Sequence, residues 1–233
     1  MARRPQTSPR KTASQNRSRL TVDALVEATA RVLTREGYDR ASTNKIAAVA
    51  GVSIGSLYQY FPSKEALVAA VIERHTQELS HVVLKALLKV AARPIEIAAR
   101  ELVAAAIEAH RVDPKLHRVL AEEVPRTGRL ENIEAVERYA RTHFRDYLEA
   151  HRSEIEVADL DLAAFILVTA VEALTHSAVL RRPDILAGEK AGEFVDEVAR
   201  LVLRYLRTPS GEPGPDTRMD GTSPAMTRKE NRR

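Results

Sequence analysis

The sequence predicts an all-α fold, in which a small N-terminal head is joined to a larger helical body. Two observations lead to this fold class. Ala, Leu, Val, Glu and Arg dominate the composition, and most of these residues favour helices. No stretch shows the sustained alternation of apolar and polar residues that is typical of a strand. Hydrophobic residues fill 44% of the 233 positions, which is enough for a sizeable core.

Composition also limits the class of protein. The absence of cysteine excludes disulfides, thiolate metal sites and cysteine nucleophiles. The basic N-terminal residues are not followed by an apolar segment, so we expect no signal peptide. The longest apolar run, Leu162–Val171, is far shorter than the roughly 20 residues that span a bilayer. We therefore expect a cytoplasmic protein that does not enter the membrane.

The first segment is a basic arm, residues 1–19, with six Lys and Arg residues and no acidic residue. It lacks apolar periodicity and is expected to be disordered. Two interpretations remain open for it: a solubilising tail, or a flexible arm that contacts phosphates or a minor groove. The first helix is expected to begin near Thr21, as its N-cap, and to stop at Gly37.

The pattern over Ser42–Leu67 predicts two short helices around a tight turn, followed by the start of a third. Gly51 stands where the chain must reverse, a position that favours a residue tolerant of positive φ. Ser53 can then cap the next helix, Ile54–Phe61, by accepting a backbone N–H. This is a helix-turn-helix, and its second helix has the form that enters a DNA major groove.

A long helix is expected to follow, capped by Ser63 and running from Lys64 to about Val90, so that it links head and body. Proline and glycine then divide the body into further helices, with breaks at Pro94, Asp113-Pro114, Pro125–Gly128, Pro183 and Gly188. The predicted domains are an arm (1–19), a helix-turn-helix domain (20–66), a helical body (67–207) and a disordered tail (208–233).

Positive charge is concentrated at the N-terminal end. Residues 1–75 hold 12 Lys and Arg against 6 Asp and Glu, whereas residues 76–207 hold 19 against 22. The positive potential therefore coincides with the helix-turn-helix, which is where a polyanion such as double-stranded DNA would bind.

The same stretch resembles the DNA-binding signature of the TetR family of bacterial regulators. The resemblance rests on Thr43, Ile46-Ala47, Ala50-Gly51-Val52-Ser53, Gly55, Leu57-Tyr58, Tyr60-Phe61, Lys64-Glu65 and Leu67, and it covers about residues 20–75. It implies a homodimeric transcriptional regulator, a repressor that a small-molecule effector releases from a palindromic operator. It also implies that the body binds the effector and forms the dimer, and that the chain is not an enzyme.

The predicted DNA-binding residues lie on and around the second motif helix. Gln59 has a donor and an acceptor and can pair with adenine, while Ile54 can contact a thymine methyl. Lys64, at the start of the long helix, is placed to contact a phosphate. The full set is Thr43, Ser53, Ile54, Gly55, Ser56, Tyr58, Gln59, Tyr60 and Lys64. The helix contains no Arg, so we expect modest direct readout with help from DNA shape or from the arm.

Two body helices carry more apolar surface than one subunit needs. Leu162–Leu174 is apolar nearly all round, and the last helix has a strong apolar face. The predicted dimer residues are Leu162, Ile166, Phe194, Val198, Leu201 and Tyr205. Polar residues at helical spacing could instead line an effector cavity, or could be satisfied in the core or at the dimer interface. These candidates are Tyr139, His143, Tyr147, Thr169, Glu172 and His176.

No cofactor or metal is expected. His75 and His81 are six residues apart, and His110 and His117 seven apart, which is not the spacing of ligands on one helix. No phosphate-binding glycine loop or nucleophile elbow is present in the sequence. Three alternatives remain: an all-α enzyme whose helix-turn-helix is only structural, a helical protein-interaction module, and a DNA-binding regulator that needs no ligand.

Overall fold

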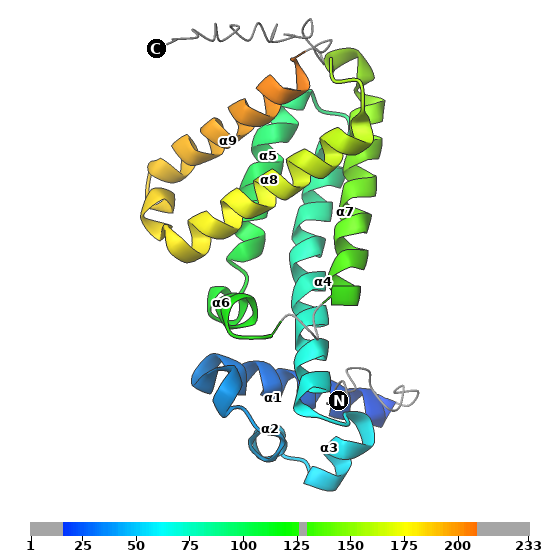
Figure 1. Cartoon of the computed structure of the whole chain (residues 1–233), viewed down its shortest axis with the longest axis vertical. Coiled ribbons are helices and arrows are strands. Elements are labelled where there is room, and N and C mark those ends of the chain that lie inside the picture. Colours follow the sequence, from blue (N-terminus) through cyan, green and yellow to red (C-terminus); the bar gives the residue numbers. More distant parts are fainter. Residues whose placement is uncertain (1–15, 126–129, 209–233) are drawn as a thin grey trace, which may run out of the picture.

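A computed structural model describes residues 16–125 and 130–208, and the described residues form helices joined by short turns (Figure 1). The predicted all-α fold class is confirmed. The elements are α1 (Asn16–Arg40), α2 (Thr43–Ala50), α3 (Ile54–Tyr60), α4 (Lys64–Val90), α5 (Ile95–His110), α6 (Pro114–Glu122), α7 (Leu130–Ala150), η2 (Arg152–Glu154), α8 (Leu160–Arg181), η3 (Pro183–Leu186) and α9 (Lys190–Leu206).

The helices form two groups along the long axis of the molecule. In Figure 1, α1, α2 and α3 gather at one end as the head, while α5, α7, α8 and α9 form the body at the other. The long helix α4 runs from the head into the body, with α7 alongside it. The short helix α6 lies between the two groups, in contact with both α1 and α8.

Side-chain caps fix the starts of the helices in this region, and the predicted caps at Ser53 and Ser63 are confirmed. The hydroxyls of Ser42, Ser53 and Ser63 accept backbone N–H bonds at the starts of α2, α3 and α4. Gly51 ends α2 in the left-handed conformation, with φ of 67°. The turn and both of its flanking helices therefore follow from local chemistry.

The predicted start of the first helix is wrong. Helix α1 already begins at Asn16, so Thr21 lies inside it and residues 16–19 belong to this helix rather than to the arm. The predicted stop at Gly37 is confirmed, because the backbone leaves helical geometry there. The rest of the predicted arm and the tail from 209 onward lie outside the described residues, as does the predicted break at Pro125–Gly128 apart from Pro125 itself.

The core of the head extends well beyond its own three helices. Leu25, Ile46, Leu57 and Phe61 are fully buried at its centre. The same apolar cluster continues through the first turns of α4 and through α6, which contributes Leu116, Val119 and Leu120, and it includes Val124 just after α6. The predicted domain boundary between residues 66 and 67 therefore divides residues that belong to one continuous core.

A contact between α1 and α6 strengthens this junction. Gly37 has φ of 78° and ψ of 173°, a backbone conformation available essentially to glycine alone. The turn directs the backbone N–H of Tyr38 onto the Glu123 carboxylate, with an N···Oε2 distance of 2.9 Å. A Cβ at position 37 would lie 2.5 Å from the same carboxylate oxygen. Glu123, directly after α6, thus holds the C-terminal end of α1 in place.

The body has its own core around α5, α8 and α9. Ala98, Leu148, Leu167 and Val202 are among its buried residues. Ion pairs at its rim join neighbouring helices, including Lys89 on α4 with Glu101 on α5 at 2.8 Å. These exposed pairs contribute little stability compared with the apolar core.

Helix α8 is long and apolar enough to span a membrane by length and composition alone. The apolar run Leu162–Val171 is only part of this helix, so the length of the run alone underestimates how long its apolar stretch is. The most apolar 18-residue window of α8 has a mean hydropathy of 1.7, and a third of it is buried inside the chain. A core helix of a soluble protein meets the same criterion, and α8 packs against α5 and α7.

We predict that Gly37→Ala destabilises the protein by about 1–3 kcal/mol, because an L-residue is strained at this φ and its methyl group displaces Glu123. Thermal denaturation measures the loss, at roughly 2–4 °C for each kcal/mol. Gly192→Ala is the matched control, since Gly192 is helical and its added methyl meets open space. Equal melting temperatures for the two variants would contradict the role given to Gly37.

Candidate nucleic-acid interface

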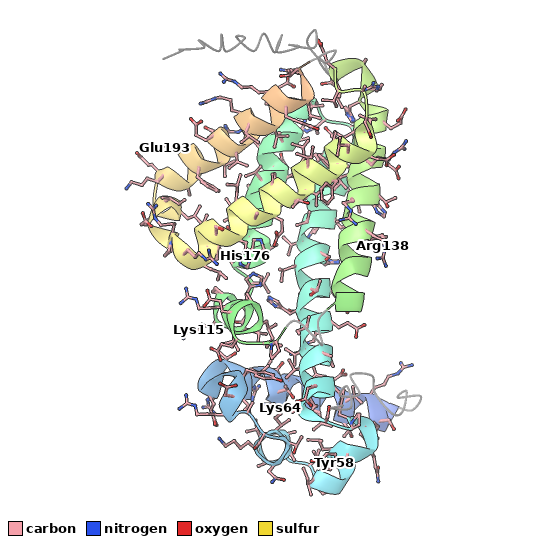
Figure 2. All side chains as sticks on the ribbon, in the orientation of Figure 1. Tyr58, Lys64, Lys115, Arg138, His176 and Glu193 are labelled. Carbon is pink, nitrogen blue, oxygen red and sulfur yellow. The ribbon has the colours of Figure 1, made fainter. Side chains whose placement is uncertain are left out.

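Helix α3 presents a polar and partly apolar face to solvent at the far end of the head. Leu57 is fully buried and anchors the helix, and Phe61 anchors the residue after it. On the opposite side, Gln59 is exposed, and Ile54 and Tyr58 are 39% and 42% exposed. Figure 2 shows Tyr58 at the end of the head that is farthest from the body. A short helix with an exposed face of this kind can enter a major groove.

Hydrogen bonds between side chains order this face. The Tyr58 hydroxyl lies 3.1 Å from the Thr43 hydroxyl, which links α3 to the start of α2. The Ser53 hydroxyl caps α3 and also lies 2.9 Å from the Ser56 hydroxyl. Of the predicted DNA-binding residues, Ser53 and Gly55 are exposed, while Thr43 and Ser56 are half-buried. Thr43 on the first turn of α2 and most of the predicted residues on and before α3 are therefore at least partly exposed at this end of the head.

Two predicted residues have partners inside the head. The Tyr60 ring is partly buried against the head core. The Lys64 ammonium donates to the backbone carbonyl of Tyr38 at 3.1 Å and lies 4.0 Å from the centre of the Tyr38 ring. Burial raises the pKa of Tyr38, and Glu65 and Asp39 raise it further, so the ring stays neutral beneath the lysine. Lys64 therefore stabilises the head, and only its remaining donors can reach a phosphate.

Two family models cover most of the chain. Residues 25–71 match the model for bacterial regulatory proteins of the tetR family, and residues 94–206 match the tetracyclin repressor-like C-terminal domain. The chain belongs to the TetR family. It is a DNA-binding transcriptional regulator, and this membership confirms that it is not an enzyme.

Individual relatives and structures agree with this assignment. Over 66 residues the chain is 38% identical to the HTH-type transcriptional regulator Rv1255c of Mycobacterium tuberculosis, which is 28% of this chain and 33% of that protein. The chain thus spans about a third of the length of the relative that it matches.

Two solved structures share the fold over about four-fifths of this chain. The fatty acid degradation regulator FadR from Bacillus halodurans superposes with a TM-score of 0.60 at 20% identity, covering 80% of this chain and 96% of that one. SmeT, the repressor of the Stenotrophomonas maltophilia multidrug efflux pump SmeDEF, gives 0.53 at 22% identity, covering 78% and 86%. At these identities the likeness establishes the fold alone.

The predicted effector residues on α7 lie in different surroundings. Tyr139 is half-exposed, and the Nδ1 of His143 lies 2.8 Å from the Tyr139 carbonyl. Tyr147 is buried and donates to the carbonyl of Arg93 at 3.2 Å. Burial raises the pKa of Tyr147 to about 12, with Glu154 and Glu96 adding to the effect. Tyr147 is thus a buried residue whose hydroxyl is hydrogen-bonded within the core, which fits the interpretation that these polar groups are satisfied inside the protein.

The predicted effector residues on α8 lie on its outer face. Thr169 and Glu172 are exposed, and they share this face with Leu162 and Phe165. We call these four residues the α8 stripe. His176 lies one turn farther along and is half-buried. An outward position fits the interpretation in which these polar groups are satisfied at the dimer interface, rather than the one in which they line an effector cavity.

The predicted dimer residues divide in the same way. Leu162 and Leu201 are 51% and 48% exposed, so both are available to a partner. Val198 is 5% exposed and lies in the chain's own core, so its side chain is not available. Ile166, Phe194 and Tyr205 are half-buried. Sequence reasoning missed Phe165, which is 50% exposed. Its spacing of three residues from Leu162 places it on the same helix face and could have identified it.

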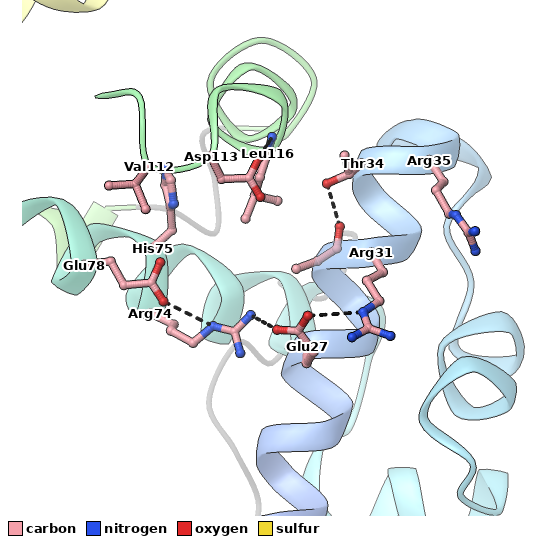
Figure 3. A pocket seen from close by; sticks show the side chains of 11 residues that line it. Glu27, Arg31, Thr34, Arg35, Arg74, His75, Glu78, Val112, Asp113 and Leu116 are labelled. Carbon is pink, nitrogen blue, oxygen red and sulfur yellow. Dashed lines mark hydrogen bonds and ion pairs between the residues drawn. The ribbon is translucent and has the colours of Figure 1, made fainter. Parts of the chain in front are cut away.

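A cleft of about 450 Å³ lies where the head meets the body (Figure 3). It is lined by Glu27, Ala30, Arg31, Thr34, Arg35, Arg74, His75, Glu78, Val112, Asp113 and Leu116. The Glu27 carboxylate pairs with both Arg31 and Arg74 at 3.1 Å, and the lining as a whole holds three arginines and three acidic residues, so its formal charges balance. None of the predicted effector residues lines it.

We predict different outcomes for Gln59→Ala and Lys64→Ala. The first removes an exposed side chain and should cost roughly 1–3 kcal/mol of base discrimination with an unchanged melting temperature. The second should weaken binding to every sequence and also lower the melting temperature, because it removes the contacts with Tyr38. Fluorescence anisotropy on a selected operator and on a random duplex, together with thermal denaturation, measures both.

Lys85→Ala is the control for the loss of one positive charge, since Lys85 is exposed on α4 within the body. It should leave both DNA affinity and melting temperature close to those of the unmodified chain. Proportional losses on specific and random DNA for Gln59→Ala would contradict a base-reading role for this residue.

Proposed function

We propose that the protein is a cytoplasmic repressor that binds a palindromic operator as a homodimer and is released by a small-molecule effector. The observation that carries this proposal is the apolar face of α8 and α9 that one chain leaves uncovered. Leu162 and Phe165 on α8 and Leu201 on α9 are each about half exposed. Large apolar side chains exposed on helices that pack together often mark a surface that a partner covers.

A second copy of the chain is the partner that fits this face best. The α8 stripe and Leu201 lie on the two helices that follow one another at the C-terminal end of the body. Packing them against their two-fold equivalents would make a four-helix interface, in which the same surface serves both subunits. Leucine and phenylalanine would form its centre, and Thr169 would lie among them as a small polar residue.

DNA recognition supports the same assembly. Helix α3 has seven residues, and without arginine it has no strong guanine reader. One such helix contacts too few bases for specific binding, whereas two heads can read two half-sites in successive major grooves. A dimer would therefore bind DNA with sequence specificity although each recognition helix alone contacts too few bases.

Release would follow from a change in the distance between the two heads. An effector that binds one arrangement of the body better than another shifts the population toward that arrangement. Helices α4 and α6 both connect the body to the head core, so a shift in the body would turn the head. The dimer would bind the operator only when the distance between its two heads matches the distance between the half-sites.

A regulator that needs no effector is the second candidate. The burial and hydrogen bond of Tyr147, together with the outward position of Thr169 and Glu172, favour it, because these residues do not converge on one cavity. Small-molecule screening by thermal shift, followed by operator release, distinguishes the two. A ligand that raises the melting temperature and releases the operator supports the first candidate.

We predict that Leu162→Glu combined with Leu201→Glu converts the protein into a monomer, because four like charges would meet at the two-fold interface. Affinity for a palindromic operator should fall by about 10²–10⁴-fold, to the level of an isolated half-site, because the second head no longer binds as part of one molecule. Light scattering after gel filtration and anisotropy titrations measure the two effects.

Leu88→Glu is the matched control, since Leu88 is 69% exposed on α4, outside both interface helices. This variant should remain a dimer and bind the operator normally. An unmodified chain that is monomeric at micromolar concentration would refute the proposed assembly.

A further inference from the structure

Four histidines from four helices meet between the head and the body. His75 comes from α4, His110 from α5, His117 from α6 and His176 from α8. The Nε2 atom of His75 lies 3.0 Å from Nδ1 of His117, and Nε2 of His117 lies 2.9 Å from Nδ1 of His176. The His110 ring completes the group, with its centre 4.9 Å from that of His117 and 5.4 Å from that of His176. We call these residues the histidine cluster.

Two members of the cluster are almost completely buried. His75 is 4% exposed and His110 is 5% exposed, whereas His117 and His176 are half-buried. The Nδ1 atoms of His75 and His110 are buried and have no hydrogen-bond partner among the residues that the structure describes. A buried nitrogen without a partner is costly and calls for a specific explanation. An imidazole nitrogen that carries a lone pair is also the commonest protein ligand for a transition metal.

The geometry fits a bound ion at three of the four rings. One ligand nitrogen from each of His110, His117 and His176 lies within 4.8 Å of the other two. Zinc–nitrogen bonds of 2.0–2.1 Å at tetrahedral angles place neighbouring ligand atoms about 3.4 Å apart. The widest pair therefore has to close by about 1.4 Å, which small ring rotations can supply.

We propose that His110, His117 and His176 bind a divalent transition-metal ion, with Zn²⁺ the best match. Imidazole ligands suit zinc and its neighbours, whereas magnesium and calcium require oxygen ligands. The chain has no cysteine, so a thiolate site for a softer ion cannot form. Three nitrogen ligands leave one coordination position open for water or for an added ligand.

His75 has a positioning role in this site. Its Nε2 is within hydrogen-bond distance of Nδ1 of His117, so it can fix the orientation of that ring while the other nitrogen of His117 faces the ion. Metal-binding histidines usually form such a bond through their second nitrogen.

The ion would connect the parts of the molecule that carry the head. His117 lies on α6 between Leu116 and Leu120, both of which are buried in the head core. His110 and His176 belong to α5 and α8 of the body. A bound ion therefore fixes α6, and with it the head, relative to these body helices. This inference goes beyond the proposed function and does not depend on it.

Titration of the metal-stripped chain, without a histidine affinity tag, tests the proposal. Cobalt(II) serves as the spectroscopic probe, and we expect one ion per subunit, with visible d–d absorption that Zn²⁺ abolishes by displacement. Zinc at about 100 times its Kd should raise the melting temperature by roughly 5–10 °C. Stoichiometric cobalt binding with these bands supports the site, and the absence of binding overturns it.

Variants identify the ligands. His117→Gln and His176→Gln should each weaken metal binding by at least about 100-fold, more than the loss of a supporting residue. His81→Gln is the control, because His81 is exposed on α4 outside the cluster. Circular dichroism verifies the fold of each variant, and if His117→Gln unfolds, the His176→Gln variant decides. Unchanged metal affinity in a folded His176→Gln variant, or equal losses in the His81→Gln control, overturns the assignment.

Discussion

The packing of α6 against the head is the constraint on which the rest of this structure depends. Two short helices around a turn bury too little apolar surface to be stable alone. Helices α1 and α4 supply part of what is missing, and Leu116 and Leu120 of α6 supply more. The bond from the Tyr38 backbone to Glu123 then fixes the one place where α1 leaves helical geometry. The head is consequently not a module on a flexible tether, and its orientation is set by the body at both α4 and α6.

The opposite end of the molecule is governed by an excess of apolar surface. Helix α8 is apolar on nearly every side, yet only a third of its most apolar window is buried within the chain. Helix α9 divides more sharply, with Val198 and Val202 in the chain's own core and Leu201 open to solvent. Burial of such surface contributes roughly 25 cal/mol for each Å² that leaves water. Association through these two helices therefore has a clear driving force, and the polar Thr169 and Glu172 are restricted to the positions that face outward.

Prediction from the sequence succeeded where the structure is local and failed where distant segments meet. The caps at Ser53 and Ser63 and the left-handed Gly51 involve neighbours within five residues, and all were predicted. The start of α1 was wrong because a plausible cap at Thr21 gave no information about the helical residues before it. Lys64 was predicted to contact a phosphate, but its bond to the carbonyl of Tyr38, 26 residues away, was not predicted. The histidine cluster joins residues 42 and 59 positions apart, which no spacing rule on a single helix can detect.

Helix α4 brings these distant contacts onto one rigid element. Lys64 at its start touches Tyr38 of the head, His75 belongs to the histidine cluster, and Leu87 and Val90 lie in the body core. Eleven residues separate Lys64 from His75, which corresponds to roughly 16 Å along the helix axis. An ion at the cluster is therefore too far away to touch DNA at α3, and it can act on recognition only by changing how α6 and α4 hold the head. Any coupling between the two sites must be reciprocal, so a metal that favours one head orientation would itself bind more tightly when DNA selects that orientation.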